Sequence, residues 1–265
     1  MATLVSFHAH PDDECITTGG VIAKYAASGN RVVIVCATGG EHGEVPDDLQ
    51  PGETIVDRRR RELECAAKEL GAARVAWLGY VDSGMTGWEQ NENEAAFANA
   101  DVEEAAERLA AILVEEEAVT LTVYDWHGNY GHPDHVQVHH VGHRAAEIAG
   151  TSHVYEATTN RDQMERLMEM AAALGMDFDD IDSDEISDDG NPMGTPEAEL
   201  TTAVDVSAFV DHKRRAIECH RSQVTDTTMF LSIPVEAFAA MMSTEWFIKK
   251  GAKPGIDEHG LAGMT

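Results

Sequence analysis

The densest chemistry in the sequence lies in the heptapeptide 8–14, HAHPDDE, which directly follows the apolar run 3–7. The heptapeptide contains two imidazoles and three carboxylates. A turn between a strand and a helix does not need so many ionisable groups in order to fold. We therefore interpret this turn as part of a reactive site.

A second cluster, HPDH at 132–135, repeats the same residue types far along the chain. It follows another predicted strand, at 119–124. In open α/β sheets, binding and catalytic sites lie at the carboxyl ends of the strands. The two turns are therefore expected on one rim of the sheet, closed on a single metal ion.

The residue types favour a catalytic zinc site. Zinc is bound by imidazole and carboxylate groups, and a catalytic site keeps three protein ligands and one open position. His10 and Asp13 lie three residues apart around a Pro-containing turn and can reach one ion, and His135 most simply completes the set. Asp12 then points away from that pair, toward the reacting water, and is expected to be the general base. Fe²⁺ could also occupy such a mixed His/Asp site.

Other ionisable residues are expected around the ion without binding it. A neighbouring carboxylate raises the basicity of histidine, so Asp134 could hold His132 as an imidazolium that stabilises an oxyanion and protonates a leaving amine. Asp134 could equally cap the following helix. His8 is expected to pack behind the ligands, and His42 and His127 lie in loops at the same rim, where they could contact substrate.

A competing ligand set is formed by His135, His139 and His143. Their spacing of four places them on one helix face, with His140 off it. Histidines at positions i and i+4 of a helix can bind a metal, but this helix must also dock on the sheet.

The elements that position these residues alternate between strands and helices. Strands are expected at 3–7, 31–38, 74–78, 119–124, 154–158 and 200–206. Helices are expected at 16–28, 56–70, 101–117, 135–149, 162–174, 207–220 and 234–248. The β-branched run 32–36 is typical of a parallel strand buried on both faces. The alternation predicts an α/β, Rossmann-like fold: a mostly parallel sheet with helices on both faces and the active site at the carboxyl rim.

We expect one domain over 1–265, because no composition shift suggests a boundary. The loop 79–99 is long enough to be functional. The stretch 175–199 holds ten acidic residues together with Gly and Pro, and it is interpreted as a solvated loop or lid.

The composition excludes some classes of partner. The chain of 265 residues carries 48 acidic and 19 basic residues, a formal charge of −29. Nucleic acids and anionic membranes need a basic surface, so neither is expected as a partner. No apolar run approaches the ~20 residues of a membrane-spanning helix. Only six basic residues are lysine, which suits a high-salt cytoplasm, although acidic drift in an ordinary bacterial protein explains the composition equally well.

The cysteines indicate a reducing compartment. None of Cys15, Cys36, Cys65 and Cys219 belongs to a C-x-x-C pair. We expect reduced thiols in a cytoplasmic protein without a signal peptide. A homo-oligomer is compatible with the sequence.

Together the two histidine turns make the chain resemble the PIG-L/LmbE-like zinc-dependent de-N-acetylases. The first motif is AHPDDE at 9–14 and the second is YGHPDH at 130–135. Between them, Arg59 and Glu62 resemble the family's Arg-x-x-Glu helix. The loop DSGM at 82–85 resembles the substrate loop of the branch that handles mycothiol and its precursors, and the segment 213–223 resembles the family's late helix.

The resemblance implies a role for each matching residue. His10, Asp13 and His135 would be the zinc ligands, Asp12 the general base, and His132 the oxyanion stabiliser or general acid. Tyr130 would be a further donor to the oxyanion. Arg59, Asp82 and Ser83 would contact the substrate, with the run of four arginines at 58–61 leaving the arginine uncertain by one residue.

The expected reaction is hydrolysis of an acetamido group on an N-acetylglucosamine-like substrate, a small sugar-like amide. One rival is an amidase that cleaves a mycothiol-type thiol conjugate. Another is a non-catalytic metal- or sugar-binding protein, which would not need Asp12 and His132. A nucleotide-binding oxidoreductase is disfavoured because the glycines after the second strand do not form G-x-G-x-x-G.

Overall fold

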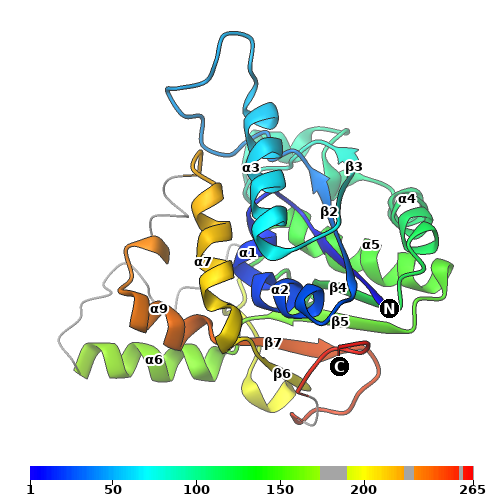
Figure 1. The fold of residues 1–265 in the computed structure, drawn as a ribbon. Helices are drawn as coiled ribbons and strands as arrows, with labels where there is room; N and C mark the ends of the chain where they lie inside the picture. The colour runs from blue at the N-terminus through cyan, green and yellow to red at the C-terminus, as the bar shows by residue number, and fades with distance from the viewer. Residues whose placement is uncertain (174–189, 224–229, 257–258, 265) are drawn as a thin grey trace.

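The computed structural model describes residues 1–173, 190–223, 230–256 and 259–264, and these form an α/β fold around a seven-stranded sheet (Figure 1). The strand order is β3-β2-β1-β4-β5-β7-β6. The strands are β1 (Thr3–His8), β2 (Arg31–Thr38), β3 (Arg74–Tyr80), β4 (Thr120–Tyr124), β5 (His153–Thr158), β6 (Thr202–Asp205) and β7 (Thr244–Lys249). Strands β1 to β5 run parallel, and β7 is antiparallel to both β5 and β6. The predicted Rossmann-like fold is confirmed.

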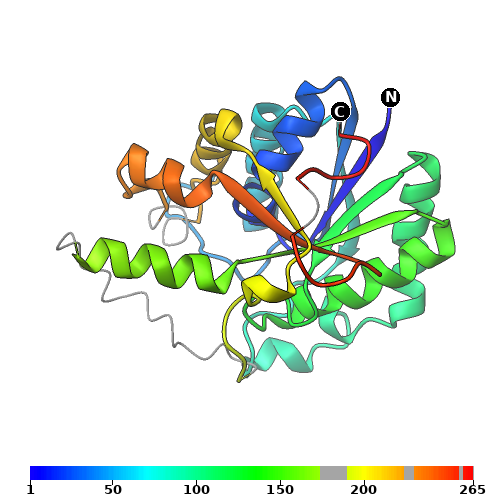
Figure 2. The ribbon, with the colours of Figure 1, turned by 90° about the horizontal axis from the view of Figure 1, so that it is seen from below.

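Helices cover both faces of this sheet. They are α1 (Asp13–Thr17), α2 (Gly19–Ala27), α3 (Ile55–Leu70), α4 (Val102–Glu115), α5 (Pro133–Ala149), α6 (Arg161–Ala173), α7 (Val210–Cys219) and α9 (Val235–Met242), with short 3₁₀ turns at 89–92, 97–99, 197–199 and 207–209. Helices α1, α2, α3 and α7 pack on one face and α4 and α5 on the other, as Figures 1 and 2 show. A hydrophobic core lies on each face of the sheet, and successive residues of β1 point to alternate faces. Leu4 packs in one core and Val5 in the other.

The order of the strands brings the two histidine turns together. Strand β1 pairs with β2 on one side and with β4 on the other. The chain adds β2 and β3 on one side of β1 and then crosses over to add β4 and β5 on the other side, so the strand order changes direction between β1 and β4. Ligands of open α/β sheets bind at this kind of switch point, beyond the carboxyl ends of the strands. The expected common rim is therefore present.

The helix expected at 16–28 is wrong in one respect, because it is broken at Thr18. This residue has φ −133° and ψ 8°, outside helical geometry, and separates α1 from α2. Its hydroxyl lies 3.1 Å from both Ser6 Oγ and His8 Nε2. The glycine pair that follows has low helix propensity, so a break in the helix costs little at this point. The buried hydrogen bonds of Thr18 therefore fix its backbone in a non-helical conformation.

The helix expected at 234–248 is also corrected. It ends at Met242, and residues 244–249 form β7, which pairs with β5 and β6. Trp246, Phe247 and Ile248 are types that favour strands, and the open edge of β5 supplies the pairing partner.

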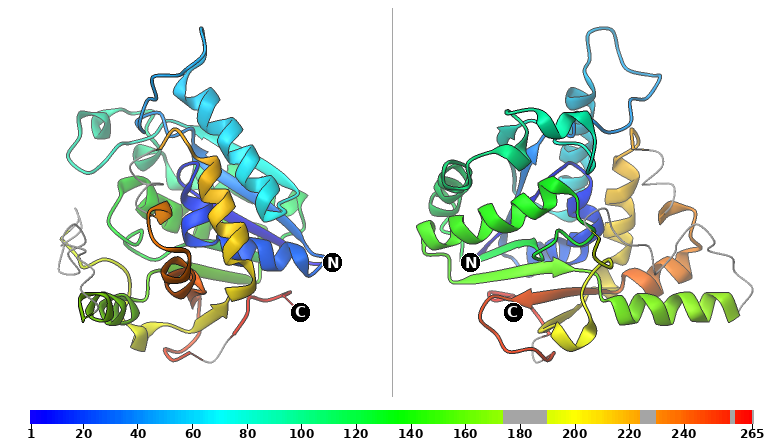
Figure 3. Two further views of the ribbon diagram at one scale, coloured as in Figure 1. Left: turned by 60° about the vertical axis from the view of Figure 1, so that its left-hand side comes forward. Right: turned by 180° about the vertical axis from the view of Figure 1, so that it is seen from behind.

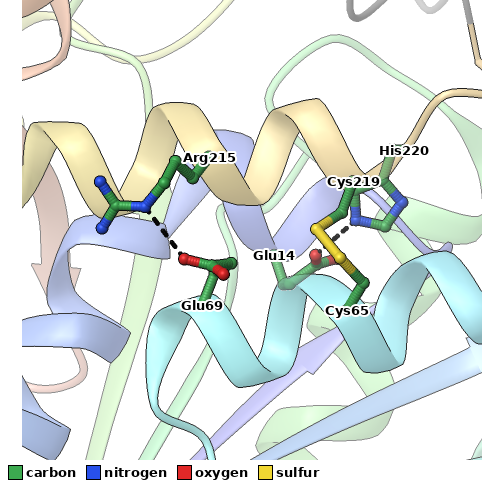
Figure 4. The surroundings of a disulfide bond; sticks show 6 residues. All are labelled: Glu14, Cys65, Glu69, Arg215, Cys219 and His220. Atoms are coloured by element: carbon green, nitrogen blue, oxygen red, sulfur yellow. Dashed lines mark hydrogen bonds and ion pairs between the residues drawn. A yellow bond between two sulfur atoms is a disulfide. The ribbon is translucent and has the colours of Figure 1, made fainter.

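The prediction of four reduced cysteines is wrong for two of them. Cys65 of α3 and Cys219 of α7 form a disulfide, whereas Cys15 and Cys36 are free and buried. The two helices lie side by side on one face of the sheet, as the left view of Figure 3 shows. Figure 4 shows the bond between them, close to the buried Glu14–His220 pair. The separation of 154 residues hid this pairing from local sequence patterns.

Removal of this disulfide is expected to destabilise the protein. The bond closes a loop of more than half the chain, and losing a crosslink of this kind typically costs about 2–4 kcal/mol. Urea unfolding of the Cys65→Ser/Cys219→Ser double variant measures the loss. A reducing agent should lower the stability of the wild type and leave the double variant unchanged. A reduced wild-type protein as stable as the oxidised form would contradict this expectation.

The acidic stretch 175–199 lies largely outside the described residues, so its role as a loop or lid stays a prediction. Its described end, from residue 190, packs on the loop after β4, where Gly194 N donates to Asn129 O at 2.7 Å. Within the described ranges, every helix is too short or too polar to span a membrane.

Candidate active site

The turn after β1 is held in a strained shape. Asp12 has φ 115°, a conformation that is costly for a residue with a side chain, and it precedes the first turn of α1. The Asp12 N–H donates to Glu14 Oε2 at 2.9 Å, and the Asp12 carbonyl accepts from Cys15 N at 3.1 Å. Backbone strain that is fixed by surrounding contacts is typical of functional turns.

The turn after β4 begins α5 with a histidine cap. His132 is the N-cap residue, and its Nδ1 accepts the Asp134 N–H at 3.1 Å. Pro133 follows at the first helical position, where its missing N–H costs nothing. Asp134 and His135 therefore project from the first turn of α5 and are buried.

The three expected metal ligands meet between these turns. His10, Asp13 and His135 each offer a ligand atom, and these atoms lie within 4.8 Å of one another. His10 Nδ1 is 3.5 Å from Asp13 Oδ2, and His135 Nε2 is 3.4 Å from Asp13 Oδ1. All three residues are at most 8% exposed.

The surroundings of this triad fit a metal ion. His135 Nδ1 lies 3.3 Å from the Gly128 carbonyl, and His10 Nε2 lies 3.1 Å from Asp134 Oδ2. Each imidazole thus gives one nitrogen to a neighbouring acceptor and leaves the other beside Asp13. Metal-binding histidines are commonly oriented in this manner. A second group, formed by His10 with Asp82, His132 and Asp134, has ligand atoms equally close together, so the two groups share His10.

Asp12 lies beside the triad in contact with one arginine. Arg59 is the buried member of the run 58–61, and its Nη2 donates to Asp12 Oδ2 at 3.0 Å. The guanidinium also donates to the carbonyls of Pro11 and Gly40. Burial raises the pKa of Asp12 to about 6, against the opposing charge of Arg59. A carboxyl group with a raised pKa is suited to exchanging protons near neutral pH.

Comparison with known proteins places this arrangement in a family. Residues 5–146, which hold both histidine turns, match the family model PIG-L, described as GlcNAc-PI de-N-acetylase. The chain belongs to the PIG-L family. A 1D-myo-inositol 2-acetamido-2-deoxy-alpha-D-glucopyranoside deacetylase of Nocardiopsis dassonvillei is 40% identical, over 96% of this chain and 95% of that protein. The protein of the same name from Saccharomonospora viridis is 35% identical, over 97% and 98%.

Solved structures of PIG-L-like fold are more distant in sequence. The N,N'-diacetylchitobiose deacetylase of Pyrococcus horikoshii superposes with a TM-score of 0.59 at 22% identity, covering 93% of this chain and 83% of that one. GalB, a 4-carboxy-2-hydroxymuconate hydratase of Pseudomonas putida, has a TM-score of 0.60 at 20% identity, covering 97% and 99%. These likenesses concern the fold, which here is shared by proteins named for different reactions.

One expectation within the PIG-L site is contradicted: Asp134 does not hold His132 as an imidazolium. The Asp134 carboxylate accepts from Ser83 N at 2.9 Å and from the Ser83 hydroxyl, and it faces His10. His132 Nδ1 accepts a backbone N–H, which requires that nitrogen to be unprotonated. Burial, together with the charges of His10 and His135, lowers the pKa of His132 to about 2. Nor is Asp134 the N-cap, because His132 holds that position.

The expected substrate residues differ in their surroundings. Asp82 Oδ1 is 3.4 Å from His10 Nε2, and Asp82 Oδ2 accepts the His42 N–H at 3.1 Å. Ser83 is fully buried and hydrogen-bonded to Asp134, so it holds the Asp134 carboxylate in place. Tyr130 is half-buried, with its hydroxyl 3.5 Å from His135 Nε2. The substrate contacts of Asp82 and His42 stay predictions.

The remaining candidates are also placed by the fold. His8 is buried behind the triad, with Nδ1 2.9 Å from the Tyr124 hydroxyl, as expected of a supporting residue. His127 is buried, with Nε2 3.4 Å from the Gly194 carbonyl. The competing set is divided, because His135 joins the triad whereas His139 Nδ1 lies 3.0 Å from the Tyr124 carbonyl.

One supporting contact could not be found from residue spacing. Glu14 Oε1 accepts from His220 Nε2 at 2.8 Å, while its other oxygen binds the Asp12 N–H. Both side chains are fully buried. Only the resemblance of the late helix to its family counterpart pointed toward His220.

Arg59 is expected to position Asp12, which gives a prediction for the Arg59→Lys variant. Lysine cannot reproduce the forked contacts to one carboxylate and two carbonyls, so Asp12 should lose its orientation. Misplacing a reacting group by about 1 Å can cost about 10²-fold in rate, and a fall of kcat of that order is expected. The exposed neighbour Arg60→Lys is the matched control. Equal kcat values in the two variants would contradict the positioning role.

Proposed function

We propose that this protein is a metal-dependent hydrolase that removes the acetyl group from an N-acetylglucosamine-like substrate. The observation that carries the proposal is the close approach of His10, Asp13 and His135 next to the strained residue Asp12. Three ligands beside a carboxylate of raised pKa suit hydrolysis better than storage of a metal, which would not need that carboxylate.

Zinc is the metal we propose for the triad, where it would act as a Lewis acid toward an amide carbonyl and lower the pKa of a water molecule. Ferrous iron fits the same ligand types. Asp12 takes the proton of the attacking water and returns it to the amide nitrogen as the C–N bond breaks, so that acetate and a free amine are released. Arg59 and Glu14 hold Asp12 in place through its side chain and its backbone N–H respectively.

His132 and Tyr130 are proposed to stabilise the oxyanion of the tetrahedral intermediate. Because His132 Nδ1 accepts a backbone N–H, the neutral ring carries its proton on Nε2 and can donate it to an oxygen. Tyr130 offers a hydroxyl beside His135 Nε2. Donors of this kind commonly contribute about 10²–10³ to the rate.

Relatives at high coverage point to the substrate. Those from Nocardiopsis and Saccharomonospora are both named for deacetylation of 1D-myo-inositol 2-acetamido-2-deoxy-alpha-D-glucopyranoside. We propose that this inositol-linked N-acetylglucosamine, or a close analogue, is the substrate, with Asp82 and His42 contacting its hydroxyl groups.

A metal-reconstituted assay over a substrate panel tests this proposal. The panel contains the inositol-linked compound, free N-acetylglucosamine, diacetylchitobiose and a mycothiol-type thiol conjugate, and both acetate and free amine are measured. We expect equal amounts of acetate and amine, released fastest from the inositol-linked compound.

The other outcomes separate the alternatives. Release of a mercapturate-like product from the thiol conjugate alone would identify an amidase in place of a deacetylase. Absence of hydrolysis across the panel, with metal bound, would favour a binding protein. Repeating the assay with Zn²⁺ and Fe²⁺ identifies the productive metal.

A further inference from the structure

Helix α5 presents a second pair of histidines that the active site does not use. His139 and His143 follow His135 at intervals of four residues, and their ring centroids are 4.5 Å apart. His135 is turned into the triad, whereas His139 and His143 lie farther along the helix and are half-buried. His140, which lies off this face, is exposed.

A carboxylate from the neighbouring strand completes a cluster. Glu156 of β5 places Oε1 2.8 Å from His143 Nε2. One ligand atom from each of His139, His143 and Glu156 lies within 4.8 Å of the other two. Two imidazoles and a carboxylate are a donor set typical of zinc and other divalent transition metals.

The ring of His139 is already oriented as a ligand would be. Its Nδ1 lies 3.0 Å from the Tyr124 carbonyl, which can only accept, so Nδ1 carries the proton and Nε2 keeps a free lone pair. Metal-binding histidines are commonly fixed by such a contact to a carbonyl.

Access and charge also suit a cation. The side chains of His143 and Glu156 keep 17% and 14% of their surface exposed, so an ion could enter and keep water on its open positions. The formal charge of −29 favours the approach of cations in general.

We propose that His139, His143 and Glu156 form a second divalent transition-metal site, separate from the active-site triad. An ion there would link α5 to β5 and so brace the helix whose first turn carries His135. The site goes beyond the proposed function, because its ligands play no part in the hydrolysis.

Zinc stoichiometry with matched variants tests the proposal. Metal-free full-length protein is dialysed against buffered Zn²⁺, and bound zinc per chain is measured by atomic spectrometry. We expect His143→Gln and Glu156→Gln each to bind one equivalent fewer than the wild type. His140→Gln, a change of the same kind on the exposed side of the same helix, should bind as much as the wild type.

Thermal unfolding gives a second readout that does not depend on activity. Zn²⁺ should raise the Tm of His140→Gln more than that of His143→Gln or Glu156→Gln. Because the two site variants lie on different elements, a folding failure of one leaves the other to decide. Equal zinc content in His140→Gln and the site variants would overturn the proposal and leave His143 and Glu156 as a hydrogen-bonded pair without a metal. The result is independent of whether deacetylation is detected.

Discussion

Asp12→Asn is expected to lower kcat by about 10²–10⁴-fold while the protein keeps its metal, because general-base catalysis typically contributes that much. The amide has nearly the shape of the carboxylate and can still accept from Arg59, yet it cannot take a proton from water. The ligands His10, Asp13 and His135 are unchanged, so metal content should equal that of the wild type. Steady-state rates of acetate release and metal analysis of the same samples measure both quantities.

A matched variant controls for the loss of a negative charge. Asp47 lies in the loop before α3, outside the described contacts of the site, and Asp47→Asn removes the same charge from the chain. Its kcat should stay near that of the wild type. Near-normal turnover in Asp12→Asn would exclude Asp12 as the base, whereas loss of metal from that variant would show that Asp12 supports the ligands instead.

Lys213→Met is expected to cause the largest loss of stability, about 3–5 kcal/mol in the free energy of unfolding, the usual cost of breaking a buried ion pair by removing one partner. Lys213 Nζ lies 2.8 Å from Glu245 Oε1, and the two side chains are only 2% and 3% exposed. Glu245 also accepts the N–H groups of Gly20 and Val21 at the start of α2. Methionine fills similar space, so the cost arises from the unpaired carboxylate. Urea unfolding measures it.

The exposed pair Lys250–Glu147 provides the comparison. Lys250 Nζ is 3.0 Å from Glu147 Oε1, with side chains 42% and 56% exposed. Lys250→Met should change the free energy of unfolding by less than about 1 kcal/mol, because solvent screens exposed pairs. A Lys213→Met protein as stable as Lys250→Met would show that burial of the first pair carries no penalty.

The sequence by itself determined the parts of the site that are local. His10 and Asp13 share one short turn, and His132 and His135 share another, so their nearness within each turn follows from spacing alone. The apolar strand runs and the alternation of elements then placed both turns at one rim. The fold and the expected triad could be predicted in this way because each step uses contacts near in sequence or a general rule of parallel sheets.

Only the tertiary structure decided the contacts between distant segments. Among the four arginines of α3, burial selects Arg59 as the partner of Asp12. The carboxylate of Asp134 accepts from Ser83, 51 residues away, and not from the ring of its neighbour His132. Cys65 and Cys219 meet across 154 residues, which overturned the expected reduced thiols. Residues 244–249 form a strand because β5 offers an edge to pair with. In each case a side chain or backbone group bonds to a partner from a distant part of the chain. Tertiary packing brings that partner near, so the residues adjacent in sequence do not predict its identity.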